Sequence, residues 1–178
     1  MKHLILSCSL SPTSRSALLA RRLESAFGSD HGSVRLIDLR ELPLPFCEAN
    51  ACYADPNVQM VTTAIAEAAT VSVATPIYNY GVGGATRNLI ALTGQAWTEK
   101  VVGFLCAAGG QGSYMAVMAV ANSLMLDFRC LIVPRFVYAS GASFSEDRIT
   151  DATIKERIDG LANDLRRIGS ALARVGPQ

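Results

Sequence analysis

A hydroxyl-rich turn near the start of the chain has the composition of a phosphate-binding site. Residues 9–16 read SLSPTSRS, directly after a short apolar run and directly before a segment of helical period. The first backbone N–H groups of a helix have no partner within it and carry the positive end of its dipole, so they attract anions. Hydroxyls and a guanidinium add further donors. The candidate phosphate ligands are Ser9, Ser11, Ser14, Arg15 and Ser16.

The same turn also allows a simpler interpretation, in which its serines only cap the helix. Its sequence has neither the lysine of the G-x-x-x-x-G-K-[ST] loop nor the glycines of the G-x-G-x-x-G turn. Hydrolysis of a nucleoside triphosphate and a standard dinucleotide site therefore lose support, and a terminal monophosphate is favoured.

A second constellation, residues 75–84, has a composition that suits a flat ring. Tyrosines offer π faces and hydroxyls, an asparagine can pair with a ring edge, and glycines let the backbone approach closely. An ordinary proline- and glycine-containing loop with two structural tyrosines is the alternative. The candidate ring contacts are Pro76, Ile77, Tyr78, Asn79 and Tyr80.

A third constellation follows the next apolar run and again places glycines where a strand becomes a helix. Its candidate site residues are Gly109, Gly110, Gln111 and Gly112. In open α/β sheets, ligands bind outside the carboxyl ends of the strands at the topological switch point. Because the three constellations follow three different strands, we expect them to converge on one crevice.

The elements that must position these turns alternate between short apolar runs and segments of helical period. This pattern is typical of βαβ units and of a parallel sheet covered on both faces. A length of 178 residues favours one domain, residues 1–178. We predict strands near 2–7, 33–39, 70–74, 100–106 and 130–133, helices near 14–27, 57–69, 84–94, 113–127 and 151–174, and long loops at 41–56 and 134–149.

Composition excludes several classes of function. A net charge of +1 with scattered basic residues argues against nucleic acid and acidic membranes as partners. Five cysteines without a C-x-x-C pair, and an apolar start too short for a signal peptide, favour a reducing, cytoplasmic compartment and structural thiols. His3 and His31 lie apart from acidic or cysteine clusters, so no metal site is expected. No G-x-S-x-G elbow is present.

The helix predicted at 113–127 is apolar on nearly every face between Tyr114 and Ala121. A helix on the surface of a monomer is normally polar on its outer side. We therefore expect a subunit interface there, with cover by the last helix or by the 134–149 loop as the alternative.

Taken together, the chain resembles the NADPH-dependent FMN reductase family, which includes flavin, quinone, azo-dye and chromate reductases. The resemblance implies a flavodoxin-like, doubly wound, five-stranded parallel sheet of order 2-1-3-4-5. It also implies that the 9–16 turn holds the FMN phosphate and that the other two constellations border the isoalloxazine. The chain departs from the family pattern at Ile77, where relatives often have an acidic residue, and at Gly83-Gly84, where they often have Pro-Gly. The motifs that carry it are residues 9–16, 42–45 (LPLP), 75–79 (TPIYN), 87–88 (RN) and 109–112 (GGQG).

By that resemblance the chain is an NAD(P)H-dependent oxidoreductase that passes hydride to FMN and then reduces a second acceptor. The acceptor is a free flavin, quinone, azo compound or metal oxyanion, and a flavin-dependent monooxygenase is a possible partner. No protein acid or base is expected, because the flavin carries the chemistry. The family also implies a homodimer or homotetramer. The alternative is a flavodoxin-type carrier or FMN-binding regulatory module without NAD(P)H reactivity, although a near-neutral charge disfavours partner docking of that type.

Overall fold

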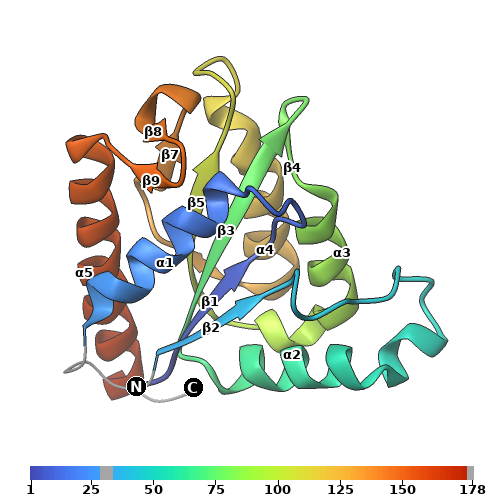
Figure 1. The fold of residues 1–178 in the computed structure, drawn as a ribbon. Coiled ribbons are helices and arrows are strands. Elements are labelled where there is room, and N and C mark those ends of the chain that lie inside the picture. Colours follow the sequence, from blue (N-terminus) through green and yellow to red (C-terminus); the bar gives the residue numbers. More distant parts are fainter. Residues whose placement is uncertain (29–33, 176–178) are drawn as a thin grey trace.

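A parallel sheet with helices on both faces forms the centre of the protein in the computed structural model (Figure 1). The structure describes residues 1–28 and 34–175, so the expectations for His31 and for Ser33 fall outside the described residues. The strands follow the order β2-β1-β3-β5-β6, with β7 also paired to β5, which confirms the predicted order. Their bounds are β1 (His3–Ser7), β2 (Val34–Asp38), β3 (Thr70–Tyr78), β5 (Val101–Ala107), β6 (Leu131–Ile132) and β7 (Val137–Ala139).

The central strands form because their residues are apolar on both sides. Every residue of β1 and β5 is buried, as expected for strands covered by helices on both faces. Strand β1 pairs with β2 and β3 in one parallel register, so that Ser7 lies opposite Asp38 on one side and Ala74 on the other. The carboxyl ends of these strands therefore reach the same edge of the sheet.

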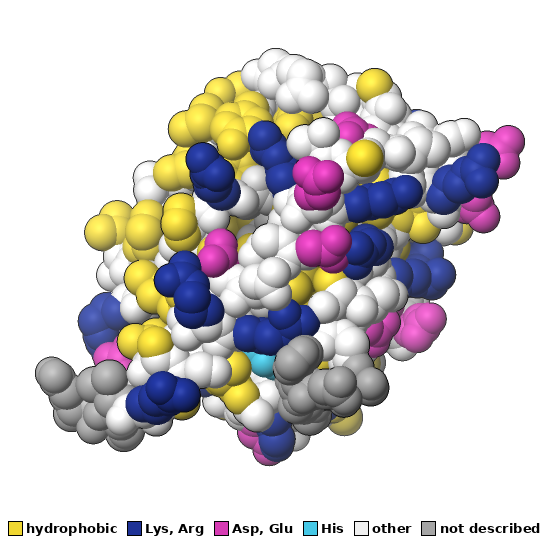
Figure 2. Space-filling view, turned by 90° about the vertical axis from the view of Figure 1, so that its left-hand side faces the viewer, with side chains coloured by type: hydrophobic (Ala, Val, Ile, Leu, Met, Phe, Trp, Pro, Cys, Tyr) yellow, Lys and Arg dark blue, Asp and Glu magenta, His cyan; other side chains and the backbone are white. Residues whose placement is uncertain are grey.

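Two helices cover one face and three cover the other (Figure 1). Helices α1 (Arg15–Phe27) and α5 (Ala152–Val175) contact each other over one face, while α2 (Pro56–Glu67), α3 (Gly84–Thr93) and α4 (Met118–Phe128) pack on the other. Ser14 caps α1, as the capping interpretation of the 9–16 turn expects, Asp55 caps α2, and Gly28 ends α1 at a φ of 63°. The face carrying α5 has interspersed basic and acidic side chains (Figure 2).

Strand β3 differs from its prediction, which ended it at 74 and placed a loop afterwards. It continues to Tyr78, with Pro76 opposite Ala107 of β5, and turns back into β4 (Gly81–Val82). Asn79 and Tyr80 have φ of 49° and 60°, and positive φ at both central residues is typical of a tight hairpin turn. Pairing with β5 thus outweighs the local preference of proline for a loop.

The fifth strand and the segment after it are also more divided than predicted. Strand β6 falls within the strand predicted at 130–133, whereas β7 falls within the predicted loop 134–149, and both pair with β5. The predicted loop therefore contains regular structure. Helix 113–127 begins as a 3-10 turn, η3 (Tyr114–Val117), before α4. The remaining short elements are η1 (Ala51–Ala54), η2 (Gly94–Trp97), η4 (Gly141–Ser143), β8 (Phe144–Ser145) and β9 (Arg148–Ile149). Among residues 1–28 and 34–175, no helix has the length and apolar character needed to span a bilayer.

Candidate functional site

The three predicted turns meet at one cavity beyond the carboxyl ends of β1, β3 and β5. Its volume is about 520 Å³, within the range of about 300–1,000 Å³ typical of small-molecule sites. This is the position where open α/β sheets bind ligands. The lining consists of Ser9, Ser11, Thr13, Ser14, Arg15, Ser16, Pro76, Ile77, Tyr78, Ala107, Ala108, Gly109 and Glu146.

Serine hydroxyls form one wall of the cavity and are held in place by the start of α1. The Ser14 hydroxyl accepts a hydrogen bond from the Ala17 N–H at 3.1 Å and lies 3.0 Å from the Ser16 hydroxyl. The Ser11 N–H donates to the Ser9 hydroxyl at 3.3 Å. Ser14 therefore does cap the helix, as the simpler interpretation requires, and it also faces the cavity.

Arg15 supplies a positive charge at this wall. Its guanidinium lies 5.6 Å from the centre of the Phe144 ring, and across the described part of the chain it has no hydrogen bond or ion pair. A methyl group on Gly141 would come within 3.2 Å of the Arg15 Nη1 and 3.1 Å of the Gly109 carbonyl oxygen. The segment around η4 and β8 therefore packs closely against a cation that has no acidic partner among the described residues.

The second and third constellations reach the cavity only in part. Pro76, Ile77 and Tyr78 line it from the end of β3, whereas Asn79 and Tyr80 lie outside the lining on the hairpin turn. Of the four site residues predicted in the glycine-rich turn, Gly109 lines the cavity. The hairpin and the tip of the third turn extend past the sheet edge, which leaves Gly110, Gln111 and Gly112 exposed outside the lining.

Several lining residues were not among the predicted site residues. Glu146 comes from the turn between β8 and β9, in a segment that the sequence indicated only as a long loop. Thr13, Ala107 and Ala108 belong to the predicted turns but were not singled out. Their place in segments that lead from a strand to a helix was the available signal, whereas nothing local to Glu146 predicts its return to the site.

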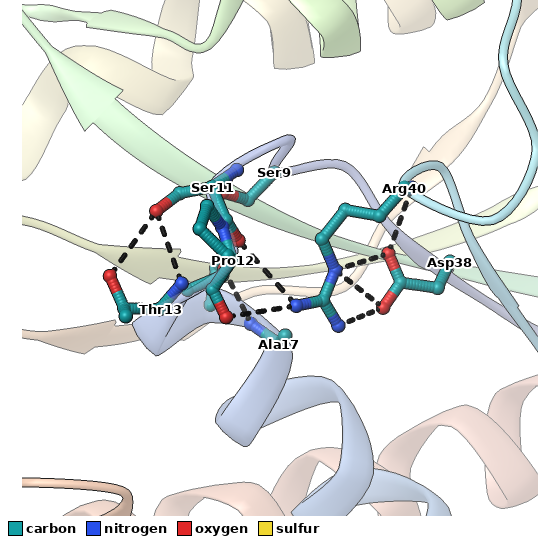
Figure 3. A network of polar contacts seen from close by, with 9 residues as sticks. Ser9, Ser11, Pro12, Thr13, Ala17, Asp38 and Arg40 are labelled. Atoms are coloured by element: carbon teal, nitrogen blue, oxygen red, sulfur yellow. Dashed lines mark hydrogen bonds and ion pairs between the residues drawn. The ribbon is translucent and has the colours of Figure 1, made fainter.

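An ion pair between buried Asp38 and partly exposed Arg40 lies next to the hydroxyl wall (Figure 3). Arg40 Nε donates to the two carboxylate oxygens of Asp38 at 3.1 and 3.0 Å, and Arg40 Nη2 also donates to Asp38. Burial acts to raise the pKa of Asp38, but the hydrogen bonds and charge of Arg40 together outweigh burial and lower it. The hydrogen bond to Asp38 raises the pKa of Arg40. Both groups are therefore charged at neutral pH.

An apolar groove lies on the other side of the same turn. Leu10 and Pro12 line it together with Arg40, while the intervening residues Ser11 and Thr13 face the cavity. Residues 9–13 therefore separate the cavity from the apolar groove and line both. The rest of the groove lining is Leu39, Leu42, Pro43, Leu44, Phe46, Gly84, Ala85 and Asn88.

Asn88 and the cysteines have structural surroundings. The Asn88 side chain accepts from the Cys47 N–H and donates to the Pro45 carbonyl, which anchors the 41–56 segment to α3. Burial raises the pKa of Cys8 and of Cys106 to about 12, so both thiols are protonated at neutral pH. Within residues 1–28 and 34–175, no cluster of histidine, cysteine and acidic side chains is placed to hold a metal ion.

The fold and this cavity define a flavodoxin-like α/β protein with a hydroxyl- and cation-lined crevice at its sheet edge. Residues 1–144 match the NADPH-dependent FMN reductase family, and the chain belongs to that family. The NAD(P)H-dependent FAD/FMN reductase of Geobacillus thermodenitrificans is 29% identical over 133 residues, covering 72% of this chain and 71% of that protein. This chain is accordingly an NAD(P)H-dependent FMN oxidoreductase.

Solved structures share the fold. The flavoenzyme NAD(P)H:(acceptor) oxidoreductase FerB of Paracoccus denitrificans superposes with a TM-score of 0.77 at 18% identity, covering 96% of this chain and 97% of that one. A flavodoxin from the domain Archaea superposes with a TM-score of 0.64 at 13% identity, covering 96% of this chain and 99% of that one. Because both an oxidoreductase and a flavodoxin share it, the fold alone does not separate reductase from carrier.

Proposed function

We propose that the 520 Å³ cavity is where this reductase holds FMN, with the phosphate at the 9–16 turn. The observation that carries this assignment is Arg15, a cation without an acidic partner in the described part of the chain, beside the serine hydroxyls at the start of α1. An unpaired guanidinium beside several hydroxyls suits a phosphomonoester, which accepts hydrogen bonds and carries negative charge.

The remaining lining residues suit the less polar end of the same ligand. When bound, FMN supplies the ring that accepts hydride from NAD(P)H and gives electrons to a second acceptor. We assign Pro76, Ile77 and Tyr78 to packing against that ring, and Gly109 to close approach of the backbone. The Glu146 carboxylate can accept but not donate, so we assign it to ligand hydroxyls rather than to the phosphate.

The predicted residues outside the cavity lining keep a role at its rim in this proposal. Asn79 and Tyr80 on the hairpin, and Gly110, Gln111 and Gly112 on the third turn, extend beyond the sheet edge next to residues that do line the cavity. We assign them to the entry path of the nicotinamide or of the acceptor. The acceptor is a small molecule such as a free flavin, quinone, azo compound or metal oxyanion, and a flavin-dependent monooxygenase is a further partner to test.

We also propose that residues 1–178 form a single FMN-binding domain that works as a homodimer or homotetramer in the cytoplasm. The support for assembly is the outer side of the η3–α4 segment. Met115 and Leu126 remain 50% and 82% exposed, even though Val120 and Leu124 of the same segment pack on the sheet. We assign these exposed apolar side chains to the proposed interface.

Anaerobic mixing tests the proposed function directly. Purified protein is first passed through gel filtration while flavin absorbance is recorded, which measures FMN retention and assembly together. It is then mixed with FMN and NADPH without oxygen, and we expect rapid bleaching of the flavin absorbance. Bleaching that requires an added reductase would instead indicate a carrier, and a protein that never binds FMN would refute the site.

A further inference from the structure

The Arg40 side chain connects the end of β2 to the turn that carries the proposed phosphate site. Its Nη1 donates to the Pro12 carbonyl oxygen at 3.2 Å and to the Ser11 carbonyl oxygen at 3.5 Å (Figure 3). Its other two nitrogens bind the Asp38 carboxylate. All three guanidinium nitrogens therefore have protein partners, in contrast to Arg15, whose guanidinium has no hydrogen bond or ion pair in the described part of the chain.

These contacts determine which way two peptide groups of the turn face. A trans peptide is planar, and its carbonyl and N–H point in opposite directions. Arg40 holds the carbonyl oxygens of Ser11 and Pro12 on its own side, next to the apolar groove. The N–H of Thr13 consequently points the other way, toward the Ser11 hydroxyl, to which it donates at 3.3 Å.

The hydroxyl side chains of the turn lie on the cavity side, opposite the two carbonyl oxygens. Ser11 and Thr13 line the cavity, and their hydroxyl oxygens lie 3.4 Å apart. If the two carbonyl oxygens were free to rotate, their negative ends could turn toward the cavity. A bound phosphate would be repelled by them, whereas a ligand without a phosphate would be little affected.

From this arrangement we propose that Arg40, held by Asp38, is a positioning residue that makes the cavity selective for flavins bearing a phosphate. The proposal rests on the proposed function, since it takes the 9–16 turn as the phosphate site. Its physical basis is that Asp38 is 7% exposed, so a fixed carboxylate orients the guanidinium and the guanidinium orients the two peptides. The turn is thus preorganised before the ligand arrives, which reduces the ordering cost of binding.

The test compares two ligands that differ by the phosphate, FMN and riboflavin. Dissociation constants for both are measured by quenching of flavin fluorescence, using the protein freed of flavin. The variants are Arg40→Met, which keeps an unbranched apolar stem but removes the guanidinium and its donors, and Arg40→Lys, which keeps the charge without the planar fork. The double variant Asp38→Asn/Arg40→Met is included because a single change at Arg40 leaves a buried carboxylate unpaired.

A matched control is Arg167→Met, which breaks another arginine–aspartate pair. Arg167 donates to Asp164 at 3.0 Å on α5, and both residues are outside the cavity and the groove. We expect Arg40→Met and the double variant to raise the Kd for FMN on the order of tenfold, the size of one hydrogen bond to a charged group. The Kd for riboflavin should stay within a factor of about two, Arg40→Lys should recover part of the selectivity, and Arg167→Met should match the parent.

Different results separate the positioning proposal from the proposed function. Equal weakening of FMN and riboflavin, or an unchanged ratio of the two constants in the folded double variant, would overturn the positioning role while leaving the phosphate site intact. A parent protein that binds FMN no more tightly than riboflavin would overturn both. Circular dichroism of each variant confirms that the compared proteins are folded.

Discussion

Replacing Arg15 by methionine tests the proposed phosphate site most directly, because the structure predicts different effects on stability and on binding. The guanidinium is exposed and has no ion pair in the described part of the chain, and its recorded contact is with the Phe144 ring at 5.6 Å. Exposed contacts of this kind stabilise by about 0.5–1 kcal/mol. For a chain of this length, that loss lowers the melting temperature by roughly 1–4 °C.

The expected effect on FMN binding is larger. A hydrogen bond to a charged group is worth about 1.5–3 kcal/mol, because the partner's charge strengthens it. Loss of one such contact raises the Kd for FMN by about 10- to 150-fold. The effect should diminish as salt is added, since salt screens exposed charges.

The assay combines flavin titration by fluorescence quenching with thermal denaturation of the flavin-free protein. Arg21→Met is the matched control, because Arg21 is an exposed arginine on the same helix that does not line the cavity. Unchanged FMN affinity in Arg15→Met would refute the phosphate assignment. Equal weakening by both variants would show a general effect of charge rather than a contact at the site.

Three further predictions concern pH, thiol reactivity and packing. Asp38 has a folded pKa below its unfolded value, so its contribution to stability is present above about pH 4 and is lost as pH falls through the folded pKa. In thermal denaturation at acid pH, the melting temperature of Asp38→Asn should therefore fall less steeply with falling pH than that of the parent. An unchanged slope would contradict the stabilising role of the Asp38–Arg40 pair. The Cys106 thiol, with its pKa at about 12, should resist iodoacetamide in the native protein at neutral pH and react after unfolding, as mass spectrometry can measure. A methyl group on Gly169 would lie 2.7 Å from Thr70 Cγ2, so Gly169→Ala should destabilise by about 1–3 kcal/mol. Gly160→Ala on the same helix, where nothing lies within 4 Å, should be neutral or stabilising by up to about 1 kcal/mol in denaturant unfolding.

Local signals in the sequence were sufficient to predict features that depend on neighbouring residues within one segment. Ser14 was among the serines predicted as possible caps, and its hydroxyl accepts a hydrogen bond from the first turn of α1. The order of the strands followed from the resemblance to a known family, and the structure confirms it. The 9–16 turn was predicted to face the sheet edge because it follows a buried strand.

Local signals failed where distant pairing outweighed them. Proline and glycine between 75 and 84 predicted a loop, but parallel pairing with β5 extends β3 through Pro76 to Tyr78. The consequence for the site is specific. The hairpin places Asn79 and Tyr80 outside the cavity lining, and their role as ring contacts stays a prediction.

The sequence by itself determined the α/β fold class, because apolar runs, helical periods and the three turns at strand ends are all local patterns. It also determined most of the hydroxyl wall, since the residues from Ser9 to Ser16 are consecutive. Only the tertiary structure decided that Phe144 and Glu146 return to Arg15 and the cavity, and that Arg40 fixes the back of the wall. These contacts join residues about 25 to 130 positions apart, so they exist only once the strands and helices have packed, and no local propensity encodes them.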